Sequence, residues 1–245
     1  MSNIRKLLFV LCAAGLAVMA SMARADEAGL RQAFQSKFPK MPIESVAPTP
    51  FPGIFEVVVE GQVLYTDEKV SYLFSGNLLD MRGSQPRNLT QETTSKIAAA
   101  TLAKATGSAV KRVKGNGKRV IYTFEDPNCG YCKELQKELV KVNDVTIYTF
   151  LWPILSQDSV EKSKAIWCSK DRAKAWEDTM LKGVAPTGKR DCDTPLEKNA
   201  QLAQRFGIRG TPGVYLANGN QIGGYLAADK IEAALAGNGS TVPYR

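Results

Sequence analysis

The chain has 245 residues, of which 44% are hydrophobic and 23% charged, so it is long enough for one or two domains with buried cores. This composition excludes collagen, coiled-coil and wholly disordered proteins. Histidine is absent, which excludes Ser–His and Cys–His catalytic pairs and zinc sites that need imidazole. The net charge of +8 at pH 7 favours solubility, and no nucleic-acid-binding motif accompanies it.

The first 25 residues have the pattern of a secretory signal peptide. A short basic start precedes the uncharged apolar run Leu7–Met19, and Ala23-Arg24-Ala25 fits a cleavage site. A run of about 13 apolar residues is too short to span a bilayer as a helix. We therefore predict export with cleavage before Asp26, which removes Cys12 and leaves four cysteines. An even number of cysteines in an exported protein favours disulfides.

Residues 26–86 are predicted to form a small N-terminal unit. Leu30, Phe34 and Phe38 have helical spacing, which predicts a helix over 26–37. From Gly53 to about Met81, four short β-rich runs predict an antiparallel meander. Between these elements, five prolines predict a stretch without regular structure: Pro39, Pro42, Pro48, Pro50 and Pro52.

A unit of about 60 residues buries too little apolar surface to be more than marginally stable as a separate domain. A homodimer formed through a strand edge or a sheet face would cover more of it. Val70–Phe74 is the strand that we expect at that edge. Packing of the meander on the second domain is the alternative.

Residues 87–117 are predicted to be a helical linker. An alanine-rich helix over 91–106 has only Ile97 and Leu102 as large apolar residues, and Asn88 or Thr90 is suited to cap it. The basic residues from Lys111 to Arg119 surround Gly115-Asn116-Gly117, so we interpret them as an exposed linker and not as a nucleic-acid patch.

Residues 118–245 alternate strands and helices, which predicts an α/β domain. Asn218-Gly219 indicates a hairpin with a type I′ turn. The strands are expected at 119–124, 145–151, 213–217 and 220–224, and the helices from Cys129, over 160–181, over 196–206 and over 229–235.

The chemistry is expected at Cys129-Gly130-Tyr131-Cys132. Two cysteines at this spacing, after a strand and opening a helix, form a redox pair. The helix N-terminus stabilises a thiolate at the first cysteine, so Cys129 is predicted to be the exposed nucleophile. Gly130 permits close approach of a backbone, and Tyr131 offers an aromatic contact. Half of a zinc site and a purely structural disulfide are alternatives, but Cys168 and Cys192 are too far apart in sequence for a second zinc knuckle.

A second motif that indicates the site is Gly210-Thr211-Pro212, just before a predicted strand. Proline at the start of a strand donates no ladder hydrogen bond, and a cis Thr211–Pro212 bond would fit a tight turn.

Together, residues 124–133 (FEDPNCGYCK) and 210–219 (GTPGVYLANG) resemble the bacterial periplasmic disulfide isomerases of the DsbC type, in the DsbC/DsbG family. The resemblance covers nearly the whole chain after the signal. It implies a small N-terminal antiparallel β dimerisation domain, a helical linker and a C-terminal thioredoxin-like domain with a helical insertion at about 152–206.

The resemblance also implies roles for individual residues. Cys129 is the nucleophile, Cys132 is the resolving thiol, and the two form the redox disulfide. Thr211 and Pro212 form the cis-proline loop that faces them. Cys168 and Cys192 match the structural disulfide of the family.

Partners and location follow from the resemblance as well. It implies a V-shaped homodimer in the periplasm, with a cleft for misfolded exported proteins that contain disulfides. A membrane thiol-reductant transporter of the DsbD type would keep the cysteine pair reduced, and no cofactor or metal is expected. The alternatives are a dithiol oxidase, a DsbG-like reductase or chaperone that protects oxidised single cysteines, and a chaperone whose cleft does the main work. The reductase relatives usually carry proline at the position of Gly130.

One departure concerns thioredoxin itself, which has a buried carboxylate six residues before the first cysteine. That position is Thr123 here. Glu125 and Asp126 lie nearer to the cysteine, and the sequence does not show whether either is buried. The group that exchanges a proton with Cys132 is therefore left open.

Overall fold

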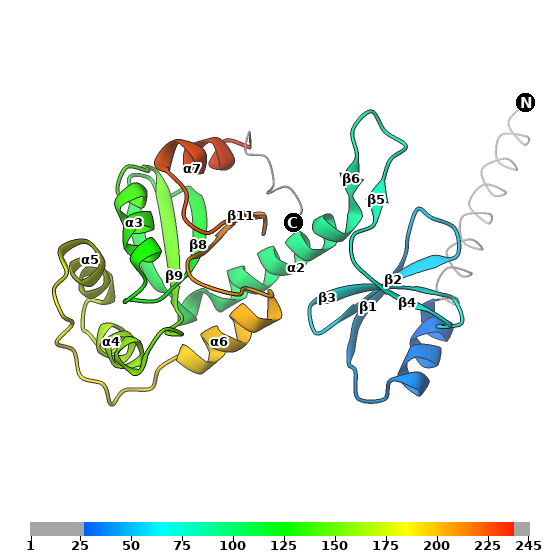
Figure 1. The fold of residues 1–245 in the computed structure, drawn as a ribbon, viewed down its shortest axis with the longest axis horizontal. Coiled ribbons are helices and arrows are strands. Elements are labelled where there is room, and N and C mark those ends of the chain that lie inside the picture. Colours follow the sequence, from blue (N-terminus) through cyan, green and yellow to red (C-terminus); the bar gives the residue numbers. More distant parts are fainter. Residues whose placement is uncertain (1–26, 238–245) are drawn as a thin grey trace, which may run out of the picture. The chain divides into compact units, whose positions relative to one another are not determined.

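The computed structural model describes residues 27–237 and divides into two compact units, with the break between Thr93 and Thr94 (Figure 1). The predicted signal peptide lies outside the described residues. Within 27–237, no helix combines the length and the apolar character needed to cross a membrane.

The first unit is an antiparallel meander with one helix packed on it. The helix spans 27–37, and the four strands are neighbours in chain order. They are β1 (Ile43–Pro48), β2 (Ile54–Val59), β3 (Gln62–Asp67) and β4 (Leu73–Ser75). Leu30 and Phe34 of the helix are buried against Val46, Val57 and Val59 of the sheet. The predicted helix and the meander topology are confirmed.

The prediction that the prolines of 39–52 exclude a regular element is wrong, because β1 lies among them. Pro42 precedes this strand and Pro48 is its last residue. β1 is an edge strand with only β2 beside it, so an amide missing at its end costs little pairing. The run ending near Met81 is also not part of the meander.

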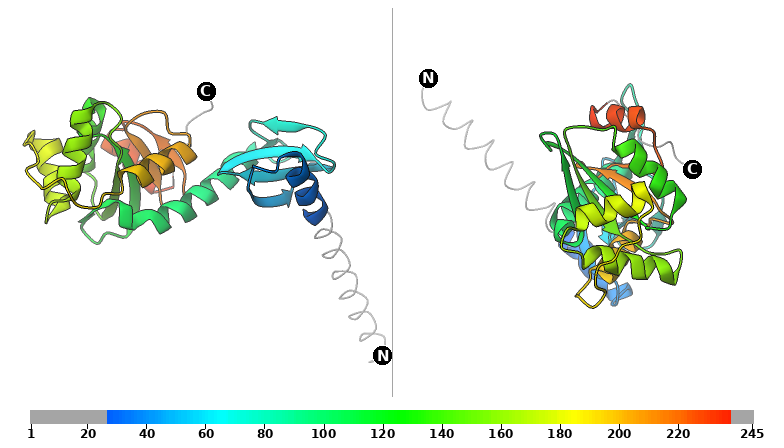
Figure 2. Two further views of the ribbon diagram at one scale, coloured as in Figure 1. Left: turned by 90° about the horizontal axis from the view of Figure 1, so that it is seen from below. Right: turned by 90° about the vertical axis from the view of Figure 1, so that its left-hand side faces the viewer.

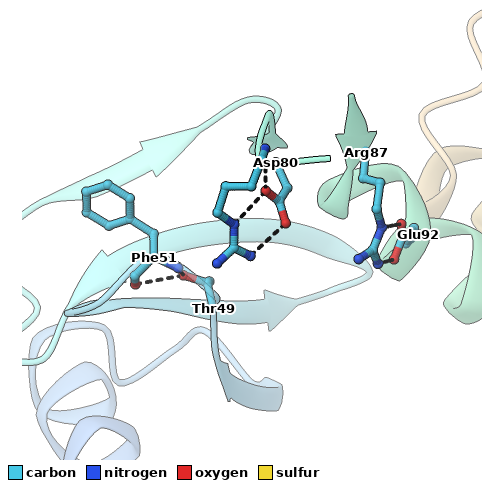
Figure 3. Close-up of polar contacts among 6 residues, drawn as sticks. Thr49, Phe51, Asp80, Arg87 and Glu92 are labelled. Carbon is cyan, nitrogen blue, oxygen red and sulfur yellow. Dashed lines mark hydrogen bonds and ion pairs between the residues drawn. The ribbon is translucent and has the colours of Figure 1, made fainter. Parts of the chain in front are cut away.

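That run forms a separate two-stranded ribbon, in which β5 (Leu79–Asp80) pairs with β6 (Arg87–Asn88). Figure 3 shows its polar contacts: Asp80 accepts two hydrogen bonds of 2.8 Å from the Arg82 guanidinium, and Arg87 donates to Glu92 at 2.8 and 3.0 Å. The arginine side chains of both ion pairs are solvent-exposed, so the pairs contribute little to stability.

The predicted edge strand is shorter than expected. β4 covers only 73–75, because Val70 adopts a φ of +53° in the preceding turn and its side chain is buried. β4 is nevertheless at the edge of its sheet. Tyr72 and Phe74 are 69% and 52% exposed there, and Leu73 is exposed as well.

The predicted linker helix is present as α2 (Leu89–Ala105), followed by a 3-10 turn over Thr106–Ser108. Asn88 caps it, since its Oδ1 accepts a hydrogen bond of 3.0 Å from the Gln91 amide. The other candidate cap, Thr90, has its hydroxyl 2.6 Å from the Tyr65 hydroxyl.

The second unit is built on a five-stranded mixed sheet with the order β11-β10-β8-β9-β7, in which only β8 and β9 are parallel. Its strands are β7 (Val110–Lys114), β8 (Arg119–Glu125), β9 (Val145–Leu151), β10 (Gly213–Leu216) and β11 (Gln221–Gly223). One core joins the sheet to α3 (Gly130–Leu139) and α7 (Ala228–Leu235), and a second joins it to α2 and α6 (Leu196–Arg205). This is the thioredoxin-like fold expected for the C-terminal part.

Three further helices lie between β9 and β10, as the predicted insertion requires. The predicted helical stretch 160–181 is two helices, α4 (Gln157–Trp167) and α5 (Arg172–Lys182), because Asp171 caps a new helix by accepting from the Lys174 amide. Figure 2 shows the two packed together (yellow-green), and α5 also contacts α3 and β7. The third is α6.

The interpretation of residues 111–119 as an exposed linker is wrong. Residues 110–114 form β7, which pairs with β9, and Arg112 is only 8% exposed. The alternating pattern of this strand places Arg112 in the interior while Lys111 and Val113 are exposed. A short strand with charged residues is typical of a sheet edge.

The prediction of a type I′ turn at Asn218-Gly219 is wrong. That turn needs a positive φ at both residues, whereas within the hairpin loop only Gly219 has one, at +80°. The Gly219 amide donates to the Leu216 carbonyl at 2.9 Å, and the Asn220 amide donates to Asn218 Oδ1 at 3.0 Å. The hairpin itself is present as predicted.

Candidate active site

Cys129 is the N-cap residue of α3, directly after β8 and its loop. Its sulfur accepts a hydrogen bond of 3.3 Å from the Cys132 amide. The sulfur therefore faces the unpaired amides and the positive end of the helix dipole, both of which favour negative charge on it. The second cysteine, Cys132, lies one turn further along the helix, away from these unpaired amides.

Cys132 is fully buried, and burial raises the pKa of its thiol far above the ordinary value. The negative charge of Glu125 raises it further. Both cysteines are free thiols in this structure. The pair is asymmetric, because one sulfur lies at the helix cap and the other is held in its neutral form inside the domain.

Thr211 and Pro212 face the cysteine pair. Their peptide bond is cis, and Cys129 Sγ lies 3.3 Å from the Thr211 carbonyl oxygen. Pro212 is buried and leads directly into β10, the neighbour of β8 in the sheet. Two sequence motifs about 80 residues apart are thus brought into contact.

The expectation that Cys129 is exposed needs correction, since only 6% of it is accessible. The cis-proline loop covers the sulfur from one side. Gly130 and Tyr131 are exposed beside it, Tyr131 by 69%. A Cβ on Gly130 would meet no atom of residues 27–237 within 4 Å, so none of these residues requires a glycine there.

Asp126 ties two loops together at the site, a role that the sequence did not indicate. Its buried carboxylate accepts hydrogen bonds from the amides of Asn128 (2.7 Å), Ile154 (2.8 Å) and Leu155 (3.0 Å). These amides come from the β8–α3 and β9–α4 loops. Exposed Ile154 and Leu155 are thereby positioned on the loop next to the one that carries Cys129.

Glu125, the last residue of β8, is fully buried as well. Gln136 Nε2 donates to both of its carboxylate oxygens, at 2.7 and 2.8 Å. Burial raises the pKa of Glu125, while a hydrogen bond from Thr123 and the charge of Arg112 counteract part of this rise. The buried carboxylate therefore exists here, two residues after the position that thioredoxin suggests.

Cys168 and Cys192 form a disulfide with a Cα–Cα distance of 5.8 Å, which closes the segment holding α5. In the chain-entropy model, a loop of this length stabilises a domain by roughly 3 kcal/mol. Among residues 27–237, no group of His, Cys, Asp or Glu is arranged to hold a metal ion.

The two units match two known domain families. Residues 21–91 match the N-terminal domain of disulfide bond isomerase proteins, and residues 106–237 match a thioredoxin-like domain. Over 207 residues the chain is 40% identical to a probable thiol:disulfide interchange protein DsbC of Bordetella parapertussis, which covers 84% of this chain and 73% of the relative. This chain belongs to the DsbC family.

Two further similar proteins agree with this assignment. DsbC of Escherichia coli K12 is 32% identical over 227 residues, which are 90% of this chain and 92% of that protein. A disulfide interchange protein of Neisseria gonorrhoeae, solved as a crystal structure, is 41% identical and superposes with a TM-score of 0.52 over 54% of this chain and 96% of its own. This DsbC-family chain is therefore a thiol-disulfide oxidoreductase.

Proposed function

We propose that this protein isomerises wrong disulfides in exported proteins through a mixed disulfide at Cys129. The observation that carries the proposal is the asymmetry of the pair: the Cys129 sulfur accepts the Cys132 amide at the start of α3, whereas Cys132 is fully buried. A thiolate is the reactive form of cysteine, and only the Cys129 sulfur lies at the amides that begin a helix.

The proposed reaction is an exchange between thiols and disulfides, in which only sulfur atoms gain or lose electrons. The Cys129 thiolate attacks one sulfur of a client disulfide, a bond forms between them, and the other client sulfur leaves as a thiolate. A client thiolate then attacks the mixed disulfide, which forms a new client disulfide and releases the Cys129 thiolate. No net oxidation occurs, and the enzyme is ready for another cycle.

Cys132 can end this cycle by releasing the client from the mixed disulfide, which we call the escape step. If no client thiol arrives, Cys132 attacks Cys129, the enzyme becomes oxidised and the client leaves reduced. The raised pKa of the Cys132 thiol makes this attack slow at neutral pH, which lengthens the life of the mixed disulfide. Slow attack by Cys132 favours rearrangement of the client over its reduction, and this supports an isomerase more than a reductase.

A refolding assay on a scrambled multi-disulfide protein tests the proposal. With reduced wild-type protein and a small thiol present, we expect recovery of the native client to accelerate. Cys132→Ala should retain much of this isomerisation, because only the escape step needs Cys132, and should accumulate mixed disulfides visible on non-reducing gels. If instead the protein with an oxidised Cys129–Cys132 pair converts a reduced client to disulfides, while the reduced protein leaves scrambled ones unchanged, the protein is an oxidase.

The cellular setting belongs to the same proposal. The N-terminal pattern supports export to the periplasm, with misfolded exported proteins as clients and a DsbD-type membrane thiol-reductant transporter as the source of electrons. A homodimer is supported by the match to the isomerase N-terminal domain and by the exposed apolar side chains at the β4 edge.

Tyr72→Glu tests the dimer. Two uncompensated carboxylates would be buried at the β4 edges of a dimer, which should raise its dissociation constant by about 100-fold or more. Sedimentation should show a monomer, and isomerase activity should fall more than reduction of a small disulfide. Val184→Glu, at an exposed apolar position in the second unit, is the control. A monomeric wild-type protein would contradict the dimer.

A further inference from the structure

The loop that leads from β8 into the cysteine pair is tied to the segment between β9 and α4 at successive residues. The Glu125 carbonyl accepts a hydrogen bond of 2.8 Å from the Trp152 amide, and the Asp126 carboxylate accepts two amides of the β9–α4 loop. The side chain of Asn128, the residue directly before Cys129, makes the last of these contacts. The exchange steps of the cysteines give this side chain no role.

Asn128 is held by the first turns of α4 through both ends of its side-chain amide. Its Nδ2 donates to Asp158 Oδ2 at 2.8 Å and to the hydroxyl of Ser159 at 3.0 Å, and Ser159 is fully buried. Its Oδ1 accepts a hydrogen bond of 2.7 Å from Lys162 Nζ. Lys162 also pairs with Asp158 at 2.6 Å, so these four side chains form one connected group, which we call the Asn128 clasp.

The chemistry of the partners fixes the orientation of the Asn128 amide. A carboxylate such as Asp158 only accepts hydrogen bonds, and an ammonium such as Lys162 only donates them. The reversed amide would set oxygen against the carboxylate and nitrogen against the ammonium. α4 does not need this contact for its own cap, since Ser156 Oγ already accepts the Ser159 amide at 3.1 Å. The Asn128 clasp therefore serves to connect α4 with the loop before Cys129.

The Asn128 clasp acts on the residue whose backbone precedes the nucleophile. The Asn128 amide donates to Asp126 Oδ1 at 2.7 Å, and the Cys129 amide donates to the Asp126 carbonyl at 3.1 Å. Pro127 between them is buried, and its ring restricts its own φ. Because both the backbone and the side chain of Asn128 are held, Cys129 is fixed from its N-terminal side. A sulfur held at the first amides of a helix favours the thiolate, whereas a sulfur on a mobile loop would lose part of that stabilisation.

We propose that Asn128 is a positioning residue, which through the Asn128 clasp holds the Cys129 sulfur at the N-terminal amides of α3. The inference rests on the proposed function, in which Cys129 is the nucleophile, and it adds a group outside the cysteine motif that sets the redox balance of the pair. Stabilising the Cys129 thiolate stabilises the reduced pair relative to its disulfide, and this raises the reduction potential. Loss of the Asn128 clasp should therefore make the Cys129–Cys132 disulfide more stable.

Equilibration with glutathione measures this balance. The reduced pair and glutathione disulfide exchange to give the oxidised pair and two glutathione thiols, so two electrons pass from the cysteine pair to glutathione. The purified protein is equilibrated over a range of glutathione ratios, quenched with acid and alkylated. The oxidised fraction of the Cys129–Cys132 pair is then read by mass spectrometry.

Asn128→Leu keeps nearly the same side-chain volume and removes every hydrogen bond of the amide. It should raise the equilibrium constant for oxidation by glutathione by about 10-fold, which corresponds to a potential lower by about 30 mV. A merely structural role of Asn128 would lower the melting temperature and leave the potential of the folded protein unchanged. Thermal unfolding of each variant is therefore recorded beside its potential.

Lys162→Met tests the Asn128 clasp from the helix side. It removes the donor to Asn128 Oδ1 and should shift the equilibrium constant in the same direction by a smaller factor. In Asn128→Leu/Lys162→Met the two shifts should not add, because both changes break the same connection. Lys164→Met is the matched control, since it removes a cation that pairs with Glu161 at 3.1 Å on the same helix, and it should leave the potential unchanged.

These variants keep the result decisive. The Lys162 side chain is 30% exposed, so Lys162→Met should fold even if Asn128→Leu does not. An unchanged potential in folded Asn128→Leu would overturn the inference, as would an unchanged potential in Lys162→Met if it alone folds. Fully additive shifts in the double variant would also overturn it, because Lys162 would then act by its charge alone. A wild type that forms no mixed disulfide at Cys129 would overturn the proposed function instead.

Discussion

Replacing Cys129 with alanine is expected to abolish disulfide isomerisation and reduction, with a loss of about 10³-fold or more, because no other free thiol of the described residues lies at a helix N-terminus. Cys132 remains, but it is fully buried and its thiol stays protonated at neutral pH. The measurement is reactivation of a scrambled disulfide protein beside reduction of a small disulfide.

The same variant separates an enzyme from a chaperone. The lost cap hydrogen bond should cost about 1 kcal/mol, so the protein stays folded. Suppression of client aggregation should therefore remain at the wild-type level. Cys132→Ala is the matched control, because it keeps the capping cysteine. Full recovery of scrambled client by Cys129→Ala would show that the thiol chemistry is not the main activity.

Gly219→Ala is expected to destabilise the second unit by about 3 kcal/mol or more, because a side chain there meets both steric and conformational penalties. Gly219 has a φ of +80°, and a Cβ would collide with the Ser95 carbonyl oxygen and lie 2.6 Å from the Ala99 nitrogen of α2. At this point the hairpin that follows the Thr211–Pro212 loop packs directly against the backbone of α2. Thermal unfolding followed by circular dichroism measures the loss.

Gly207→Ala is the matched control for this prediction. Gly207 also has a positive φ, of +62°, but a Cβ on it would meet no atom within 4 Å. Its replacement should cost only about 1 kcal/mol for the backbone conformation. Equal losses in the two variants would mean that the close approach of the hairpin to α2 contributes nothing to stability.

Much of the thioredoxin-like unit could be predicted because its signals are local. β8, β9 and the terminal hairpin follow from short apolar runs, and α6 follows from its apolar spacing. β1 and β7 were missed because a partner strand decides their conformation. Pro48 at the end of β1 and the lysines of β7 disfavour a strand locally, while pairing with β2 and β9 outweighs that preference.

The site residues also fall into two groups, those identified by local sequence motifs and those whose roles depend on distant elements. Cys129 and Cys132 are identified by their spacing, and Thr211-Pro212 by its motif. The partners of Asp126 and Glu125 could not be predicted, because they lie on other elements: the amides of Ile154 and Leu155, and the side chain of Gln136. By composition alone, two adjacent acidic residues before a cysteine are expected at the surface. Their burial depends on elements distant in sequence, namely α3 for Glu125 and the β9–α4 loop for Asp126.

The oxidation state of the four cysteines in living cells tests the central claim most directly. Intact cells expressing the protein are quenched with acid, free thiols are alkylated, and each cysteine is assigned by mass spectrometry. We expect Cys129 and Cys132 to be alkylated and Cys168 and Cys192 to be joined, since an isomerase must begin each cycle with a reduced Cys129. Two joined pairs in the resting cell would contradict the account and identify an oxidase.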